Sequence, residues 1–92
     1  MIIAVDCDGT LADNKQVNTR LIGRLIKEQR KGNQVILWTC RSSYRLAEAI
    51  RTLSQHGLRP DYVNANTPDT IRRLGYDPRK VLADVYIDDK NA

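Results

Sequence analysis

The chain has 92 residues, of which 41% are hydrophobic and 28% are charged, and its formal net charge is +4. This length predicts a single domain over residues 1–92, without room for a second domain or a large lid. No apolar stretch approaches the roughly 18 residues that a membrane-spanning helix needs, so we expect no membrane-embedded segment.

Strands and helices are predicted to alternate along the chain. Four apolar stretches are typical of buried strands, namely residues 1–6, 34–39, 61–64 and 85–87. Three stretches have the apolar spacing of helices, namely 18–31, from Ser42 or Ser43 to Gly57, and 67–75. This alternation predicts a three-layer α/β/α fold of the Rossmann-like type, with a small parallel sheet of order 3-2-1-4. The polar segment 9–17 is expected to be an irregular lip.

Polar side chains follow three of the predicted strands at their carboxyl ends. They are Asp6 and Asp8, then Thr39-Cys40-Arg41, then Asp88-Asp89. Ligands of open parallel sheets bind beyond the carboxyl ends of the strands, so we expect these residues to form one site.

The first of these clusters requires a counterion. Alternate residues of a strand share a face, so Asp6 and Asp8 can point into one site. Two close carboxylates are costly unless a cation or a proton lies between them. Oxygen-rich sites suit Mg²⁺, whereas the unpaired cysteines and the single histidine, His56 at a helix end, do not suit zinc.

The same residues carry a family resemblance. Asp6-Cys7-Asp8-Gly9-Thr10-Leu11 resembles the first motif of the haloacid dehalogenase superfamily. Thr39 after an apolar strand is similar to the second motif, and Lys80 is loosely similar to the third. Ile87-Asp88-Asp89 resembles the fourth motif. The four motifs occur in the family's order and span most of the chain.

The resemblance implies a phosphatase that acts through an aspartyl phosphate. Asp6 would be the nucleophile, and Asp8 would protonate the leaving oxygen and then activate the attacking water. Thr39 and Lys80 would hold the phosphoryl oxygens. The implied cofactor is Mg²⁺, and Asp89 is favoured over its neighbour as the direct ligand. The implied metal ligands are Asp6, Asp8 (through its backbone carbonyl), Asp88 and Asp89.

Arg41 adds a second resemblance. A guanidinium after the phosphate-binding Thr39 could grip another phosphate oxygen or the leaving group. The pattern is similar to the 3′-phosphatase part of polynucleotide kinase-phosphatases. The chain has no room for the family's cap domain and therefore resembles a capless member. Such members act on large substrates or use a second copy of the chain as a lid, which here would cover the open site or the sheet edge.

The charge favours an anionic partner. Fifteen residues are basic and eleven are acidic, and four of the acids fall in the motifs above. The remaining surface is more basic than the net charge indicates, which favours phosphorylated metabolites or nucleic acid. We therefore expect the substrate to be a phosphomonoester on a nucleotide or a nucleic-acid end.

Other interpretations fit parts of the pattern. A phosphate- or nucleotide-binding module with vestigial chemistry would keep the same fold. A phospho-receiver domain uses similar residues, but its phosphorylated aspartate follows a later strand. A P-loop hydrolase is excluded, because no Gly-x-x-x-x-Gly-Lys-Ser/Thr is present. Residue by residue, Thr39 could cap a helix, Asp88-Asp89 could be a solvated tail, and Lys80 could be a surface lysine among Arg72, Arg73 and Arg79.

The two cysteines, Cys7 and Cys40, lie next to site residues. The first apolar run is short and ends in Asp6, unlike a signal peptide. We therefore expect reduced thiols in the cytoplasm. Small buried residues are one interpretation of the pair. Oxidation that links or modifies them and suppresses activity is the other.

Overall fold

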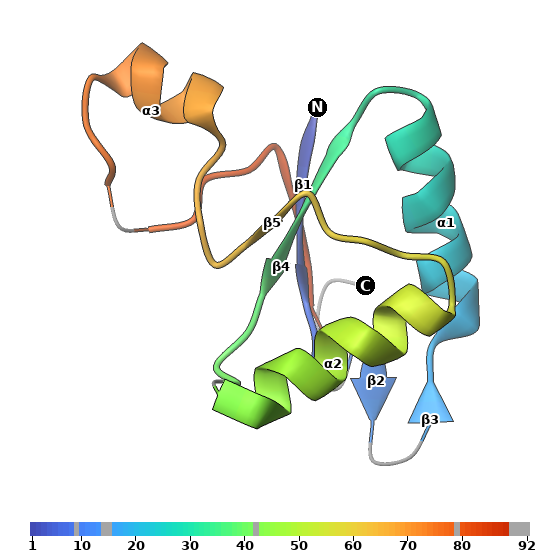
Figure 1. The fold of residues 1–92 in the computed structure, drawn as a ribbon. Helices are drawn as coiled ribbons and strands as arrows, with labels where there is room; N and C mark the ends of the chain where they lie inside the picture. Colours follow the sequence, from blue (N-terminus) through green and yellow to red (C-terminus); the bar gives the residue numbers. More distant parts are fainter. Residues whose placement is uncertain (9, 14–15, 42, 79, 89–92) are drawn as a thin grey trace.

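The computed structural model describes residues 1–8, 10–13, 16–41, 43–78 and 80–88 (Figure 1). Four parallel strands form the main sheet, in the order β5-β4-β1-β6. Their bounds are Ile2–Asp6 (β1), Gln34–Trp38 (β4), Tyr62–Val63 (β5) and Val85–Ile87 (β6). The three helices are Thr19–Arg30 (α1), Ser43–Gln55 (α2) and Pro68–Leu74 (α3). The chain therefore has the expected α/β organisation with a small parallel sheet.

The segment expected to be an irregular lip contains two further strands. Ala12–Asp13 (β2) and Gln16–Val17 (β3) pair antiparallel. Each has only two residues, too few for a recognisable alternation of side chains. Because this hairpin adds two strands to the count, the observed order β5-β4-β1-β6 differs in its numbers from the predicted 3-2-1-4. The four stretches predicted as strands are nevertheless neighbours in the order that was expected.

Local signals fix the helix ends. The Asn18 side chain caps α1, since its Oδ1 accepts a hydrogen bond from the Leu21 N–H at 3.0 Å. Thr67 caps α3 in the same way, and Pro68 fills the first turn. Gly75 ends α3 with φ of 82°, a left-handed conformation that suits glycine. The predicted starts and stops of these two helices are confirmed.

Helices α1 and α2 bury the same face of the sheet. The buried core joins residues of both helices to alternate residues of β1 and β4, namely Leu21, Ile22, Leu25, Ala49 and Leu53 with Ile3, Val5, Val35 and Leu37. Ala4 and Ile36 point to the opposite face and are also fully buried. Burial on both faces explains why β1 and β4 are continuous apolar runs.

The direction of the connections separates α3 from the other helices. The chain steps from β1 to β4 to β5 in one direction, then returns past them to β6. Right-handed crossovers place a returning helix on the other side of the sheet. Figure 1 shows α1 and α3 on opposite sides of the strands.

Two aspartates fix the amino ends of the edge strands. Asp84 accepts the Ile2 N–H through its Oδ2 at 2.7 Å and donates its own N–H to the Ile2 carbonyl at 2.8 Å. Asp61 repeats both contacts with Val35, at 2.7 and 2.8 Å. Asp84 thus has a structural role at the edge opposite the candidate site.

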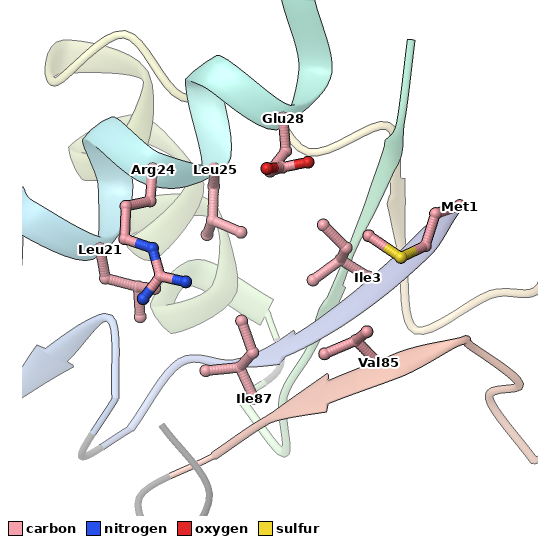
Figure 2. A pocket seen from close by; sticks show the side chains of 8 residues that line it. All are labelled: Met1, Ile3, Leu21, Arg24, Leu25, Glu28, Val85 and Ile87. Carbon is pink, nitrogen blue, oxygen red and sulfur yellow. The ribbon is translucent and has the colours of Figure 1, made fainter. Parts of the chain in front are cut away.

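An apolar cavity of about 170 Å³ lies between α1 and the edge strand β6 (Figure 2). Its apolar lining comes from Ile3, Leu21, Leu25, Val85 and Ile87, with Met1, Arg24 and Glu28 around them.

Within the described ranges, we find no helix with the length and apolar character needed to cross a membrane.

Candidate active site

Asp6 ends the central strand β1, and the strand register determines its neighbours. Trp38 of β4 is its direct partner. Val5 is paired with Ile87 of β6, so Asp88 follows at the level of Asp6. Adjacent strands lie about 4.8 Å apart, which brings the backbones of Asp6 and Asp88 together as the motifs predict.

A tight turn follows β1 and positions Asp8. The Cys7 carbonyl accepts hydrogen bonds from three N–H groups, those of Thr10 at 3.3 Å, Leu11 at 3.0 Å and Ala12 at 3.0 Å. Asn18 ties this turn to α1, because its Nδ2 donates to the Thr10 carbonyl at 3.1 Å. The turn therefore leaves the carboxyl edge of the sheet with Asp8 at its exposed start.

Asp8 is paired with Arg41, a contact that the sequence did not predict. The Arg41 Nε and Nη2 both donate to Asp8 Oδ1, at 3.0 and 2.7 Å. The carboxylate is 57% exposed and the guanidinium 23% exposed. The hydrogen bond that Arg41 donates to Asp8 raises the pKa of Arg41, so the guanidinium stays charged. Two predicted site residues from different strand ends therefore meet directly.

Asn64 holds the backbone at Thr39. Its Oδ1 accepts the Thr39 N–H at 2.8 Å, and its Nδ2 donates to the Thr39 carbonyl at 2.9 Å. Asn64 has φ of 51°, a left-handed conformation that asparagine tolerates better than most residues. The Thr39 hydroxyl accepts the Arg41 N–H at 3.1 Å. It therefore closes a turn before α2 instead of capping that helix, and its O–H can still donate to a phosphoryl oxygen.

Asn66 organises the loop that carries Lys80. This asparagine is 5% exposed, and its Nδ2 donates to the Lys80 carbonyl at 2.8 Å. Its Oδ1 accepts the Leu82 N–H at 2.7 Å, and its Nδ2 also reaches Asp77 Oδ1 at 3.2 Å. The Lys80 backbone is thus fixed from the loop that follows β5.

Lys80 lines a cavity of about 340 Å³ together with Trp38, Asn64, Val81 and Tyr86. Trp38 and Tyr86 each stand next to a core-facing residue of their own strand, and neighbouring side chains of a strand point to opposite faces. This cavity therefore opens on the face of the sheet opposite α1. Neither aromatic residue was a predicted site residue. Their strands are not adjacent in sequence, and only the register brings them together.

The acidic residues have the chemistry for Mg²⁺, since all are hard oxygen donors. Asp8 is compatible with the predicted arrangement because its side chain binds Arg41 while its carbonyl is the implied ligand. Among the described residues, no group of three or more His, Cys, Asp or Glu residues is arranged to hold a metal ion. The predicted ligand Asp89 and the motif glycine Gly9 lie outside those residues.

The hydroxyl of Thr10, in the turn after β1, is a buried polar group to be explained. Its Oγ1 has no hydrogen-bond partner within the part of the chain that is described. Buried polar atoms are usually satisfied by protein groups, water or an ion. Thr10 lies two residues after Asp8, in the turn that leaves the sheet.

The two cysteines have different environments. Cys7 is buried in the core, and burial raises the pKa of its thiol above the ordinary value. Cys40 is exposed, and both thiols are free. The interpretation of small buried cysteines therefore holds for Cys7 and is wrong for Cys40.

Comparisons with known proteins identify one solved structure for which the similarity covers the whole chain. No family model and no curated protein matches the sequence. The solved structure is that of a conserved protein from Bacteroides thetaiotaomicron, with 32% sequence identity. The match covers 100% of this chain and 78% of that chain, with a TM-score of 0.81.

Proposed function

The chain belongs to the same family as the conserved protein from Bacteroides thetaiotaomicron, and from its own residues we propose a Mg²⁺-dependent phosphomonoester hydrolase. One observation carries this function: Asp6 ends the central strand beside Asp88, and the turn that holds Asp8 follows at once. The order of these residues along the chain resembles the motif order of the haloacid dehalogenase superfamily, which supports the proposal. We also propose that family's three-layer, capless core and the cytoplasm as the compartment.

The proposed reaction has two balanced steps. In the first, an Asp6 oxygen bonds to phosphorus while the bond from phosphorus to the leaving oxygen breaks, and Asp8 gives that oxygen its proton. In the second, Asp8 takes a proton from water, whose oxygen bonds to phosphorus and releases phosphate and the Asp6 carboxylate. Bound Mg²⁺ would supply positive charge to the phosphoryl oxygens, with Asp6, Asp88 and Asp89 as its side-chain ligands.

Thr39 and Lys80 would hold the phosphoryl oxygens. The Thr39 backbone is fixed on both sides by Asn64, so the hydroxyl can be presented without reorganisation. Asn66 similarly fixes the backbone of Lys80. An ammonium group near the nucleophile offsets repulsion between the Asp6 carboxylate and an anionic phosphate.

Arg41 would act as a positioning residue for Asp8. Two of its nitrogens bind one carboxylate oxygen, which restricts the rotation of the Asp8 side chain. In the substrate-free state, the guanidinium thus binds Asp8 and is not directed at a phosphate position. When substrate binds, the same guanidinium can turn toward the phosphate or the leaving group, as the motif likeness implies.

A phosphate- or nucleotide-binding module without turnover is the second candidate. The observation that favours it is the ion pair itself, because a carboxylate engaged by Arg41 must be released before it moves protons freely. Phosphate binding through Thr39 and Lys80 would not need that release.

The test is phosphate release from a panel of phosphomonoesters, including 5′- and 3′-phosphorylated oligonucleotides, with Mg²⁺ and with EDTA. We expect metal-dependent release that Asp6→Asn abolishes. Asp69→Asn is the matched control, because this carboxylate is 80% exposed on α3. Full activity of Asp6→Asn would reject the proposed nucleophile. Phosphate binding without turnover would favour the binding module.

A further inference from the structure

The cavity beside Lys80 has the composition of a site for a planar ring. Two of its five lining residues are aromatic, Trp38 and Tyr86, and they are 44% and 38% exposed. Its volume of about 340 Å³ falls at the lower end of small-molecule sites, which run from roughly 300 to 1,000 Å³. Large aromatic groups left open to solvent around a cavity are a typical platform for stacking.

The two rings are held in place before any ligand binds. Their centroids lie 6.2 Å apart with an interplanar angle of 72°, an edge-to-face contact. The Tyr86 hydroxyl donates to the Val81 carbonyl at 2.7 Å and accepts the Ala83 N–H at 3.0 Å. Binding of a ligand ring would therefore cost little additional side-chain entropy, because these rings are already ordered.

This cavity adjoins the proposed nucleophile. Trp38 is the direct register partner of Asp6, so the two side chains project from the same face of the sheet. Tyr86 pairs with Ala4, two residues before Asp6 on that face. A phosphate at Asp6 would leave the rest of its molecule within reach of the Trp38 ring. Lys80 supplies a cation at the same cavity.

We propose that the cavity formed by Trp38, Asn64, Lys80, Val81 and Tyr86 binds the nucleobase of the substrate, stacked against Trp38. The inference rests on the proposed function, since it assigns that enzyme's substrates to mononucleotides or terminal nucleotides of a nucleic acid. The ring would bind in the cavity while its phosphate lies at Asp6. Sugar phosphates without a base would lack this contact.

The only tryptophan of the chain is Trp38, so its fluorescence reports directly on the cavity. The probes are adenosine, adenosine 5′-monophosphate and ribose 5-phosphate, titrated without metal into the Asp6→Asn variant, with free tryptophan amide as the absorbance control. We expect saturable quenching by adenosine and its monophosphate and none by ribose 5-phosphate. Absence of saturable quenching by both base-containing probes would overturn the proposal.

Variants separate stacking from general damage. We expect Trp38→Leu to weaken adenosine monophosphate binding, measured by calorimetry, by roughly tenfold, and Trp38→Phe to retain most of it. Tyr44→Ala, which removes a 76% exposed aromatic residue of α2, is the control. Equal affinity of Trp38→Leu and the control would reject the stacking contact, and thermal unfolding checks that each variant is folded.

Turnover distinguishes this inference from the proposed function. Quenching by adenosine with no phosphate release from any substrate would retain the base site and reject the hydrolase. Equal kcat/KM for ribose 5-phosphate and adenosine monophosphate, without quenching, would retain the hydrolase and reject the base site. Comparing mononucleotides with 5′- and 3′-phosphorylated oligonucleotides then identifies which source supplies the base.

Discussion

Asn64 holds the Thr39 peptide groups from both sides, accepting the N–H at 2.8 Å and donating to the carbonyl at 2.9 Å. The contact joins the loop after β5 to the end of β4. Asn64, which lies 25 positions later in the chain, therefore fixes the backbone of Thr39, the residue proposed to bind phosphate.

Replacing Asn64 should damage both stability and phosphate binding. Asn64→Ala removes two part-buried hydrogen bonds and strains a left-handed backbone, so we expect a loss of about 2–3 kcal/mol in the free energy of unfolding. Asn64→Gly keeps the backbone conformation and should lose less. Urea unfolding measures both variants. If the glycine variant also has normal affinity for inorganic phosphate, the Asn64 side chain does not position Thr39.

Arg41 should affect activity more than stability. Its pair with Asp8 is partly exposed, and such pairs contribute about 0–1 kcal/mol to folding. We expect Arg41→Ala to lower kcat by roughly tenfold or more, and Arg41→Lys to restore little, since one ammonium cannot replace two fixed nitrogens. Steady-state kinetics of phosphate release provide the measurement. Arg45→Ala, at an exposed position of α2, is the control, and an equal effect there would contradict the role of Arg41.

The two thiols should react at different rates. Burial raises the pKa of Cys7 from its ordinary value of 9.0, so its thiol stays protonated and enclosed near neutral pH. Cys40 is exposed. We expect one fast-reacting thiol per folded chain with an aromatic disulfide reagent, and none in Cys40→Ser. Two fast thiols in the native protein would contradict the burial of Cys7.

The same shift predicts a dependence of stability on alkaline pH. Because the pKa of Cys7 is higher in the folded than in the unfolded chain, the folded state holds its proton longer. This contribution is fully present below the unfolded pKa of about 9, and it is lost as the pH rises through the folded value. Urea unfolding between pH 8 and 10 should show a smaller decline for Cys7→Ala. An unchanged slope would contradict the shift.

Asp84 should matter for folding alone. Its carboxylate accepts the Ile2 N–H at the amino end of the sheet, so Asp84→Ala should cost roughly 1–3 kcal/mol of unfolding free energy. Asp84→Asn keeps an acceptor oxygen and should cost less. Both variants should keep the KM of the parent for the best phosphomonoester. A raised KM would contradict a purely structural role for Asp84.

The sequence predicted those elements whose signals are local. Thr67, Pro68 and Gly75 specify a helix start and stop within a few residues, and the buried strands are continuous apolar runs. The hairpin of β2 and β3 was missed because strands of two residues have no period to detect.

The sequence predicted which residues stand at the candidate site, but it did not predict the contacts between them. Asp6, Asp8 and Thr39 stand at strand ends, which follows from the alternation of elements. The pairing of Asp8 with Arg41 spans 33 residues, and no local pattern encodes it. Asn64 and Asn66 flank Ala65 in a short polar run after β5, a signal that marks a turn and gives no hint of the strands it would bind.

Two cavities lie near the carboxyl end of the sheet, one on each of its faces. Arg41 lines a cavity with Cys7 and Leu53 on the helix-covered face, whereas Trp38 and Tyr86 line one on the other face. We therefore expect substitutions around Trp38 to leave the contacts of the Asp8–Arg41 pair intact. In the proposed enzyme, recognition of the base and transfer of protons would therefore use side chains on opposite faces of the sheet, so that one could be altered by substitution without the other.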